Sequence, residues 1–288
     1  MSGTLRRLSG TTPETRWEAV FAAPDPRLGQ IVLGDYQGWV ETAPLPVFRR
    51  QMPVVMVPVI LNFGPSWEVG SPRTDNGALR PFDSFIAGLH DQSADTQSRG
   101  DAACLQLNLT PLGAYRLLGL PMHEIANRTL DLMDLLGTAG ADLIDQLCNA
   151  DDWHWRFNLL DAFLLARISD RAPVADDIAW ALAQLQRSHG KLAIGRLADD
   201  LSVSRKRLIN RFHDQIGLPP KTIGRIYRFN RMLAHLQRPK RQSLAELADA
   251  CGYYDQAHFN RDFRDFAGCA PGTYLAGLAP AAPEMADI

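Results

Sequence analysis

The first part of the chain alternates short apolar runs with glycine and proline, a pattern that predicts strands. Four runs stand out between about residues 30 and 110: Gln30–Val40, Val54–Phe63, Phe82–His90 and Cys104–Leu109. Several short strands separated by turn-forming residues are typical of a small antiparallel barrel or sandwich. We therefore predict a β-rich fold for this part of the chain.

The hydrophobic pattern changes to helical spacing after Pro111. Three short helices are predicted, at Leu112–Leu118, Leu130–Leu136 and Ala141–Leu147, and a long amphipathic helix at Asp152–Ile168. The apolar positions of the long helix recur three or four residues apart. Such a face most often packs inside its own chain, but it also suits a subunit contact.

The charge of the chain is unevenly distributed. The 288 residues carry a net charge of −2, yet residues 187–275 hold 16 Lys and Arg against 8 Asp and Glu, and the rest hold 14 against 24. A basic segment of domain size joined to an acidic one favours a polyanion-binding module beside a second module. The four cysteines lack metal-binding spacing, and no secretory signal or run of 18 apolar residues is present. We therefore expect reduced thiols, a cytoplasmic protein and no membrane span.

The basic segment contains an internal repeat. Residues 197–199 and 247–249 both read Leu-Ala-Asp, fifty positions apart. One extra residue, Tyr254, then shifts the repeat to 51, which aligns residues 204–212 with 255–263. Each copy predicts a short helix, a tight turn and a second helix, which together make a helix-turn-helix.

Each predicted second helix begins at a residue suited to cap it. Ser204 and Asp255 can each accept a hydrogen bond from a backbone N–H that the helix leaves unpaired. Gly252 stands at the turn of the second copy, where glycine adopts a positive φ at low cost. A generic helical repeat would not place caps at matching positions, so the repeat favours two helix-turn-helix units.

Helical geometry then predicts which side chains of the second helices face outward. Leu208 and Phe212, like Phe259 and Phe263, are predicted to face the core. The opposite and lateral positions suit DNA, with arginine and amide side chains at base edges and lateral cations at phosphates. A solvated surface is the alternative for such charges. The residues assigned to DNA contact are Ser204, Arg205, Lys206, Arg207, Asn210, Arg211, Gln256, Ala257, His258, Asn260 and Arg261.

Two stretches of the basic segment resemble the motifs of the AraC/XylS family of transcription regulators. They are residues 204–212 (SRKRLINRF) and, more specifically, 252–274 (GYYDQAHFNRDFRDFAGCAPGTY). The resemblance covers about 174–275 and implies two helix-turn-helix subdomains joined by a long helix, here Lys221–Gln237. The family commonly has arginine at the position of Asn210. This departure implies weaker or different base recognition by the first helix.

The N-terminal half resembles the sensor-like domain of one branch of that family, at residues 55–64, 85–88 and 110–120. The resemblance implies a small β-barrel that binds a ligand, dimerises, or does both. We expect an α+β chain with a β-rich sensor or dimerisation domain at 1–150. A connecting helix and linker follow at 151–173, an all-α DNA-binding domain at 174–278 and a tail at 279–288. The expected partners are promoter DNA, a small-molecule effector, a second copy of the chain and RNA polymerase.

Two other functions compete with an effector-responsive regulator. The N-terminal domain could serve only to dimerise or to bind a protein, because the aromatic residues that might line a pocket suit a core equally well. These are Trp17, Tyr36, Trp39, Phe63 and Trp67. The other alternative is a fused enzyme, such as an alkyl-transfer repair protein with Cys104 as its reactive thiol. Cys104 lies in a predicted strand, where a buried thiol is usual, so we expect neither catalysis nor a cofactor.

Overall fold

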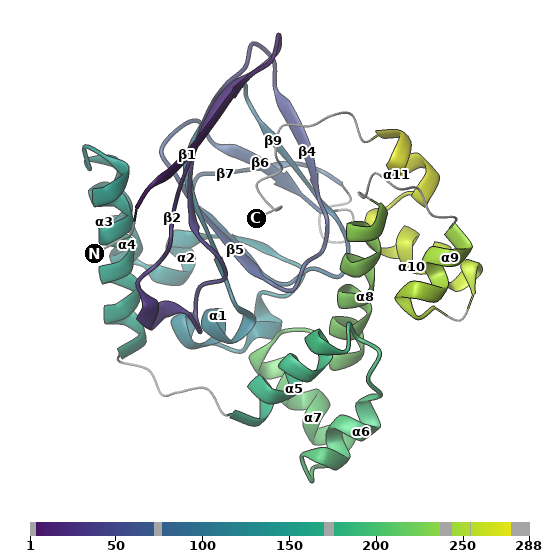
Figure 1. Cartoon of the computed structure of the whole chain (residues 1–288). Coiled ribbons are helices and arrows are strands. Elements are labelled where there is room, and N and C mark those ends of the chain that lie inside the picture. The colour runs from purple at the N-terminus through teal and green to yellow at the C-terminus, as the bar shows by residue number, and fades with distance from the viewer. Residues whose placement is uncertain (1–3, 72–76, 170–175, 237–243, 254, 278–288) are drawn as a thin grey trace.

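The computed structural model describes residues 4–71, 77–169, 176–236, 244–253 and 255–277 (Figure 1). The predicted linker residues Arg171, Ala172 and Pro173 lie outside these ranges. So do Tyr254, Gln237 at the end of the predicted linking helix, and the tail at 279–288.

Two antiparallel sheets form the N-terminal half of the described chain. One has the order β1-β2-β3-β10-β5-β8-β11 and the other β4-β9-β6-β7. The β-rich prediction is thus confirmed. The strands are β1 (Arg6–Thr11), β2 (Arg16–Ala22), β3 (Tyr36–Thr42), β4 (Val47–Gln51), β5 (Val57–Asn62), β6 (Trp67–Gly70), β7 (Arg80–Phe82), β8 (Phe85–Ala87), β9 (Ala94–Ser98), β10 (Asp101–Leu109) and β11 (Thr129–Asp131).

Three of the predicted elements differ from the structure. Residues 30–35 form turns rather than strand, because Gly34 adopts a φ of 70° and β3 begins only at Tyr36. The predicted strand over 82–90 is two short strands, β7 and β8, separated by a bend at 83–84. The predicted helix over 130–136 begins as β11, which pairs with β8, before the chain turns helical at Leu132.

Helices flank the sheets and form the C-terminal half (Figure 1). The short helices η1 (Pro26–Leu28) and η2 (Met122–Glu124) lie in loops. The α-helices are α1 (Pro111–Leu118), α2 (Leu132–Leu136), α3 (Thr138–Cys148), α4 (Trp153–Ser169), α5 (Asp176–Arg187), α6 (Ile194–Asp200), α7 (Arg205–Gln215), α8 (Pro220–Leu236), α9 (Leu244–Cys251), α10 (Gln256–Ala267) and α11 (Pro271–Gly277). The α+β class is confirmed, and α8 is the predicted linking helix.

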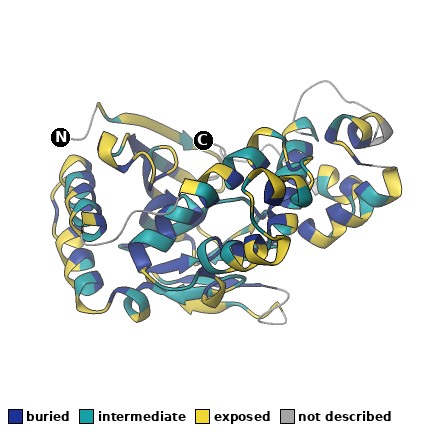
Figure 2. Cartoon of the chain, turned by 90° about the horizontal axis from the view of Figure 1, so that it is seen from below, coloured by how far each residue is buried: buried dark blue, intermediate teal, exposed yellow. Residues whose placement is uncertain are grey.

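Helix α4 packs inside its own chain along its apolar face. Trp153 and Phe157 are buried, and an added Cβ at Gly38 of β3 would lie only 2.5 Å from the Trp153 ring. The buried Asp161 accepts hydrogen bonds from the Tyr36 hydroxyl at 2.8 Å and from the Asp25 backbone N–H at 3.0 Å. Figure 2 shows that the helices of the chain have two sides, with buried residues facing inward and exposed residues facing outward.

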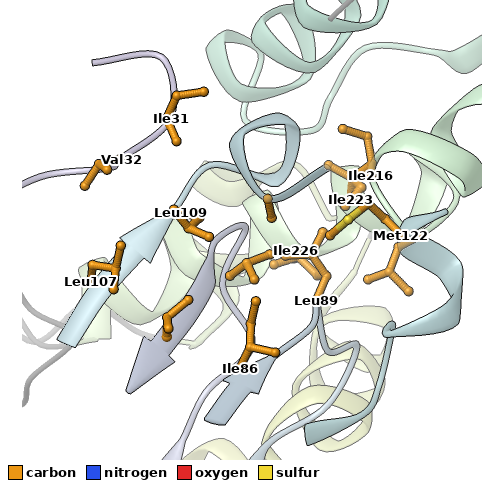
Figure 3. Packing of buried hydrophobic residues seen from close by; sticks show 14 of the residues in the cluster. Ile31, Val32, Ile86, Leu89, Leu107, Leu109, Met122, Ile216, Ile223 and Ile226 are labelled. Atoms are coloured by element: carbon orange, nitrogen blue, oxygen red, sulfur yellow. The ribbon is translucent and has the colours of Figure 1, made fainter. Parts of the chain in front are cut away.

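One hydrophobic cluster continues from the sheets into the C-terminal helices. Leu89 and Met122 of the N-terminal half belong to the same cluster as Ile216, Ile223 and Ile226, and all five are almost fully buried (Figure 3). The stacked rings of His123 and His213, with 4.7 Å between centroids, add to this interface. The two halves are therefore held together by packing as well as by the chain.

Candidate functional site

The two copies of the sequence repeat have the same turn. Ser202 and Gly252, fifty residues apart, both adopt a positive φ, of 54° and 80°. The residue after each turn donates its N–H back to the first helix over the same distance, 2.9 Å, in Val203 to Ala198 and Tyr253 to Ala248. The repeat is therefore reproduced in the backbone hydrogen bonds, and Gly252 has the predicted conformation.

Both second helices begin at the predicted caps. The Ser204 hydroxyl accepts the N–H of Arg207 at 3.2 Å, at the start of α7. The Asp255 carboxylate accepts the N–H of His258 at 2.6 Å, at the start of α10. Each cap satisfies one of the N–H groups that a helix leaves unpaired, which stabilises the first turns of α7 and α10.

The first of these helices turns basic side chains to solvent. Leu208 and Phe212 are buried as predicted, whereas Arg205, Lys206, Arg207 and Asn210 are exposed. No ion pair to these three cations occurs among the residues that the structure describes. The exposed face of α7 therefore offers three cations to an anionic partner, with Ser204 and Asn210 beside them.

Arg211 differs from its neighbours because the protein already neutralises it. Its guanidinium binds both carboxylate oxygens of Asp177 on α5, with the Nη2–Oδ1 distance at 2.7 Å. The exposed fractions of the two side chains are 24% and 31%, so the pair is partly shielded from water. The sequence prediction missed this ion pair, because the two residues lie 34 positions apart.

Helix α10, which corresponds to α7 and is called the second recognition helix below, has a smaller basic face. Gln256, Ala257 and Arg261 are exposed, whereas His258 and Asn260 are half-buried. The ring of His258 packs edge-on against Tyr253, with 5.3 Å between ring centroids.

An ion pair that the sequence prediction missed supports α10 from the inner side. Arg225 of α8 contacts the buried Asp262 and the exposed Asp265, each at 2.8 Å. The linking helix is thereby fixed to the second recognition helix, which positions the outward residues of α10.

A cavity of about 110 Å³ lies between the two sheets, at the end nearest the C-terminal helices. This volume is roughly eight times what a single water needs. Of the five aromatic residues weighed from the sequence, Trp67 lines the cavity. Trp17 and Trp39 instead stack on each other with ring centroids 5.2 Å apart, and Tyr36 binds Asp161. The residues that line the cavity are Gln51, Met52, Pro53, Val54, Met56, Pro58, Ile60, Trp67, Val69, Phe85, Ala87, Gly88, His90, Gln92, Ala94, Thr96, Gln106 and Thr129.

Two loops at the rim of this cavity bond directly to the C-terminal helices. The carbonyl of Pro53 accepts a hydrogen bond from the side-chain amide of Asn230 on α8, at 2.7 Å. The N–H of Ser93, which follows the cavity residue Gln92, donates to the carbonyl of Phe266 on α10, also at 2.7 Å. The cavity wall is thus in hydrogen-bond contact with both the linking helix and the second recognition helix.

Cys104, the thiol considered as a possible nucleophile, lies in the core of the N-terminal half. Cys104 is fully buried in β10, and burial raises the pKa of its thiol to about 12. The nucleophilic thiolate is therefore scarce at neutral pH. Groups of three or more potential metal ligands do not occur among the described residues. None of the described helices is long and apolar enough to cross a membrane.

Two capped helix-turn-helix units that expose basic faces define the C-terminal half as a double helix-turn-helix DNA-binding domain. Residues 197–277 also match a protein-family model described as a helix-turn-helix domain. This match identifies residues 197–277 as an AraC-type helix-turn-helix domain.

Searches for whole-chain relatives gave remote structural matches. No curated protein matches the sequence. The chain is similar to an apo ToxT variant from Vibrio cholerae strain SCE256, with a TM-score of 0.46 and 10% identity over 93% of this chain and 99% of that one. It is also similar to wild-type ToxT of that strain bound to an unsaturated fatty acid, with a TM-score of 0.45 and 12% identity over 83% of this chain and 97% of that one.

Proposed function

We propose that residues 174–278 bind double-stranded promoter DNA through α7 and α10. The observation that carries this proposal is that both helices are capped and turn exposed cations and amides away from the core. Lateral cations suit phosphates, and arginine, asparagine and glutamine can each pair with a base through two bonds. The proposed contacts are Ser204, Arg205, Lys206, Arg207, Asn210, Gln256, Ala257, His258, Asn260 and Arg261. Arg211 is set apart because Asp177 already neutralises it.

The N-terminal domain, in this proposal, binds a small-molecule effector in the cavity between its sheets. The support is mechanical: the loops of Pro53 and Gln92 line the cavity, and their neighbouring backbone groups bond to α8 and α10. An effector that favours one position of these loops would bias the position of the second helix-turn-helix unit. The chain would then sense a ligand and read DNA without a separate sensor protein.

The alternative is an N-terminal domain that only dimerises or binds a protein. We also propose a homodimer that acts in the cytoplasm, with RNA polymerase as a further partner. Trp155, 58% exposed on the outer side of α4, is an apolar group that a second copy would cover. The effector proposal and the alternative of a domain that only dimerises or binds a protein differ in one measurable respect. Only the effector proposal requires a small molecule to occupy the cavity.

The DNA proposal is tested by selection on randomised DNA with the wild type, Arg261→Ala and Asn210→Ala. Arg261→Ala should cost about 1–3 kcal/mol on the preferred site and relax one base position there. Asn210→Ala should cost less and act about ten base pairs away. Arg264→Ala, which removes an exposed arginine in the last turn of α10, is the matched control. An even loss of affinity with an unchanged preferred sequence would make Arg261 a phosphate contact instead.

A further inference from the structure

The lining of the cavity carries neither a carboxylate nor an arginine or lysine among the described residues. Arg49 and Arg50 lie on β4, the strand that leads into the cavity, but each is paired elsewhere. Arg49 contacts Glu41 at 2.6 Å, and Arg50 contacts Asp95 at 2.8 Å. A carboxylate or ammonium group placed in this cavity would therefore lose its hydration without gaining a counter-charge, which is strongly unfavourable.

The cavity wall nevertheless holds two hydrogen-bond donors without a partner. The indole N–H of Trp67 and the side-chain amide nitrogen of Gln92 are buried and make no hydrogen bond within the described chain. The amides of two other wall residues are already used, Gln51 by Thr96 at 3.5 Å and Gln106 by Asn108 at 3.0 Å. Buried donors are normally paired, so an unpaired set at a cavity favours a ligand that supplies an acceptor.

We propose that the cavity takes an uncharged, mainly apolar molecule with one carbonyl-type oxygen. This oxygen accepts hydrogen bonds from the side-chain amide of Gln92 and the indole N–H of Trp67. This inference rests on the proposed effector function and specifies its ligand class. The apolar body of the ligand packs against residues such as Met52, Ile60 and Phe85, and its oxygen accepts the hydrogen bond. Because Gln92 precedes Ser93, which is bonded to α10, the recognised oxygen lies next to a contact with the second recognition helix.

Three probes of the same branched shape test the ligand class by isothermal titration of the full chain at pH 8. They are 4-phenyl-2-butanone, 3-phenylpropanoate and isopentylbenzene, in which the same phenylethyl group ends in a methyl ketone, a carboxylate or an isopropyl group. The ketone should bind at least tenfold more tightly than the carboxylate, and more tightly than the hydrocarbon by about two- to tenfold, the worth of one hydrogen bond.

Variants then assign the binding to the donors. Gln92→Leu and Trp67→Phe should reduce or remove the advantage of the ketone over the hydrocarbon. Gln97→Leu, in β9 five residues after Gln92 and outside the cavity lining, is the matched control and should leave that ratio unchanged. Ala94→Phe should fill the cavity and weaken all three probes.

The outcomes separate the ligand class from the proposed function. If the carboxylate binds more tightly than the ketone and Ala94→Phe abolishes its binding, the cavity is an effector site and our assignment of ligand class is wrong. If no probe binds, or binding is insensitive to Ala94→Phe, the cavity is not the effector site and that part of the proposed function falls as well. An unchanged ketone advantage in both Gln92→Leu and Trp67→Phe overturns the role of the two donors.

Discussion

The ion pair between Arg211 and Asp177 leads to a quantitative prediction about salt dependence. Each phosphate that a cation neutralises contributes about −0.9 to the slope of log affinity against log salt. A rise from 50 to 200 mM salt then weakens binding by about 3.5-fold per phosphate contact. Arg207 is exposed, whereas Arg211 is held by two carboxylate contacts. Arg207→Ala should therefore flatten the slope by about 0.9, and Arg211→Ala should leave it nearly unchanged.

Asp177→Asn provides the sharper half of this test. The substitution keeps the shape of the side chain but removes its charge, which releases Arg211 toward DNA and should steepen the slope by about 0.9. The double variant with Arg211→Ala should return to the wild-type slope. Fluorescence anisotropy on one DNA duplex at four or more salt concentrations gives the slopes, and thermal unfolding checks that each variant is folded. A slope that Arg211→Ala flattens as much as Arg207→Ala would refute the reasoning, because Arg211 would then exchange Asp177 for a phosphate on binding.

Three further predictions concern the stability and chemistry of the chain. Asp255→Ala should destabilise α10 by about 1 kcal/mol, seen by chemical denaturation, whereas Asp255→Asn should preserve most of the cap. At pH 8 a thiol reagent should label the exposed Cys148 and spare Cys104, since burial raises the pKa of Cys104 to about 12 and keeps it protonated; rapid native-state labelling of Cys104 on mass-spectrometric mapping would contradict this. Ile226→Ala should cost about 2–5 kcal/mol of unfolding free energy, because the side chain is fully buried between the two halves.

The DNA-binding units could be predicted from the sequence because their signals are local. A cap such as Ser204 or Asp255 acts on a backbone group three residues away, and the turn at Gly252 depends on one φ angle. Helical periodicity placed Leu208 and Phe259 inside for the same reason. The positive φ of Ser202 was not predicted, because serine carries no such preference.

The cavity could not be predicted, because its wall is assembled from strands that are distant in sequence. Residues from Gln51 to Thr129 contribute to it, and they come from strands of both sheets and from the loops between them. Aromatic character alone did not separate Trp67, which lines the cavity, from Trp39, which stacks in the core. The contact from Ser93 to α10 joins backbone atoms, so no side-chain type marks it in the sequence.

The continuous cluster of Leu89, Met122, Ile216, Ile223 and Ile226 bears on how such chains can recombine. A chimaera that joins this double helix-turn-helix domain to a foreign sensor would expose three isoleucines unless the new partner supplies matching apolar groups. The hydrophobic effect would then favour aggregation or a shifted docking angle over the original geometry. Exchange of regulatory halves between related chains is therefore constrained by residues such as Leu89 and Met122, which carry no role in reading DNA and lie outside the double helix-turn-helix domain.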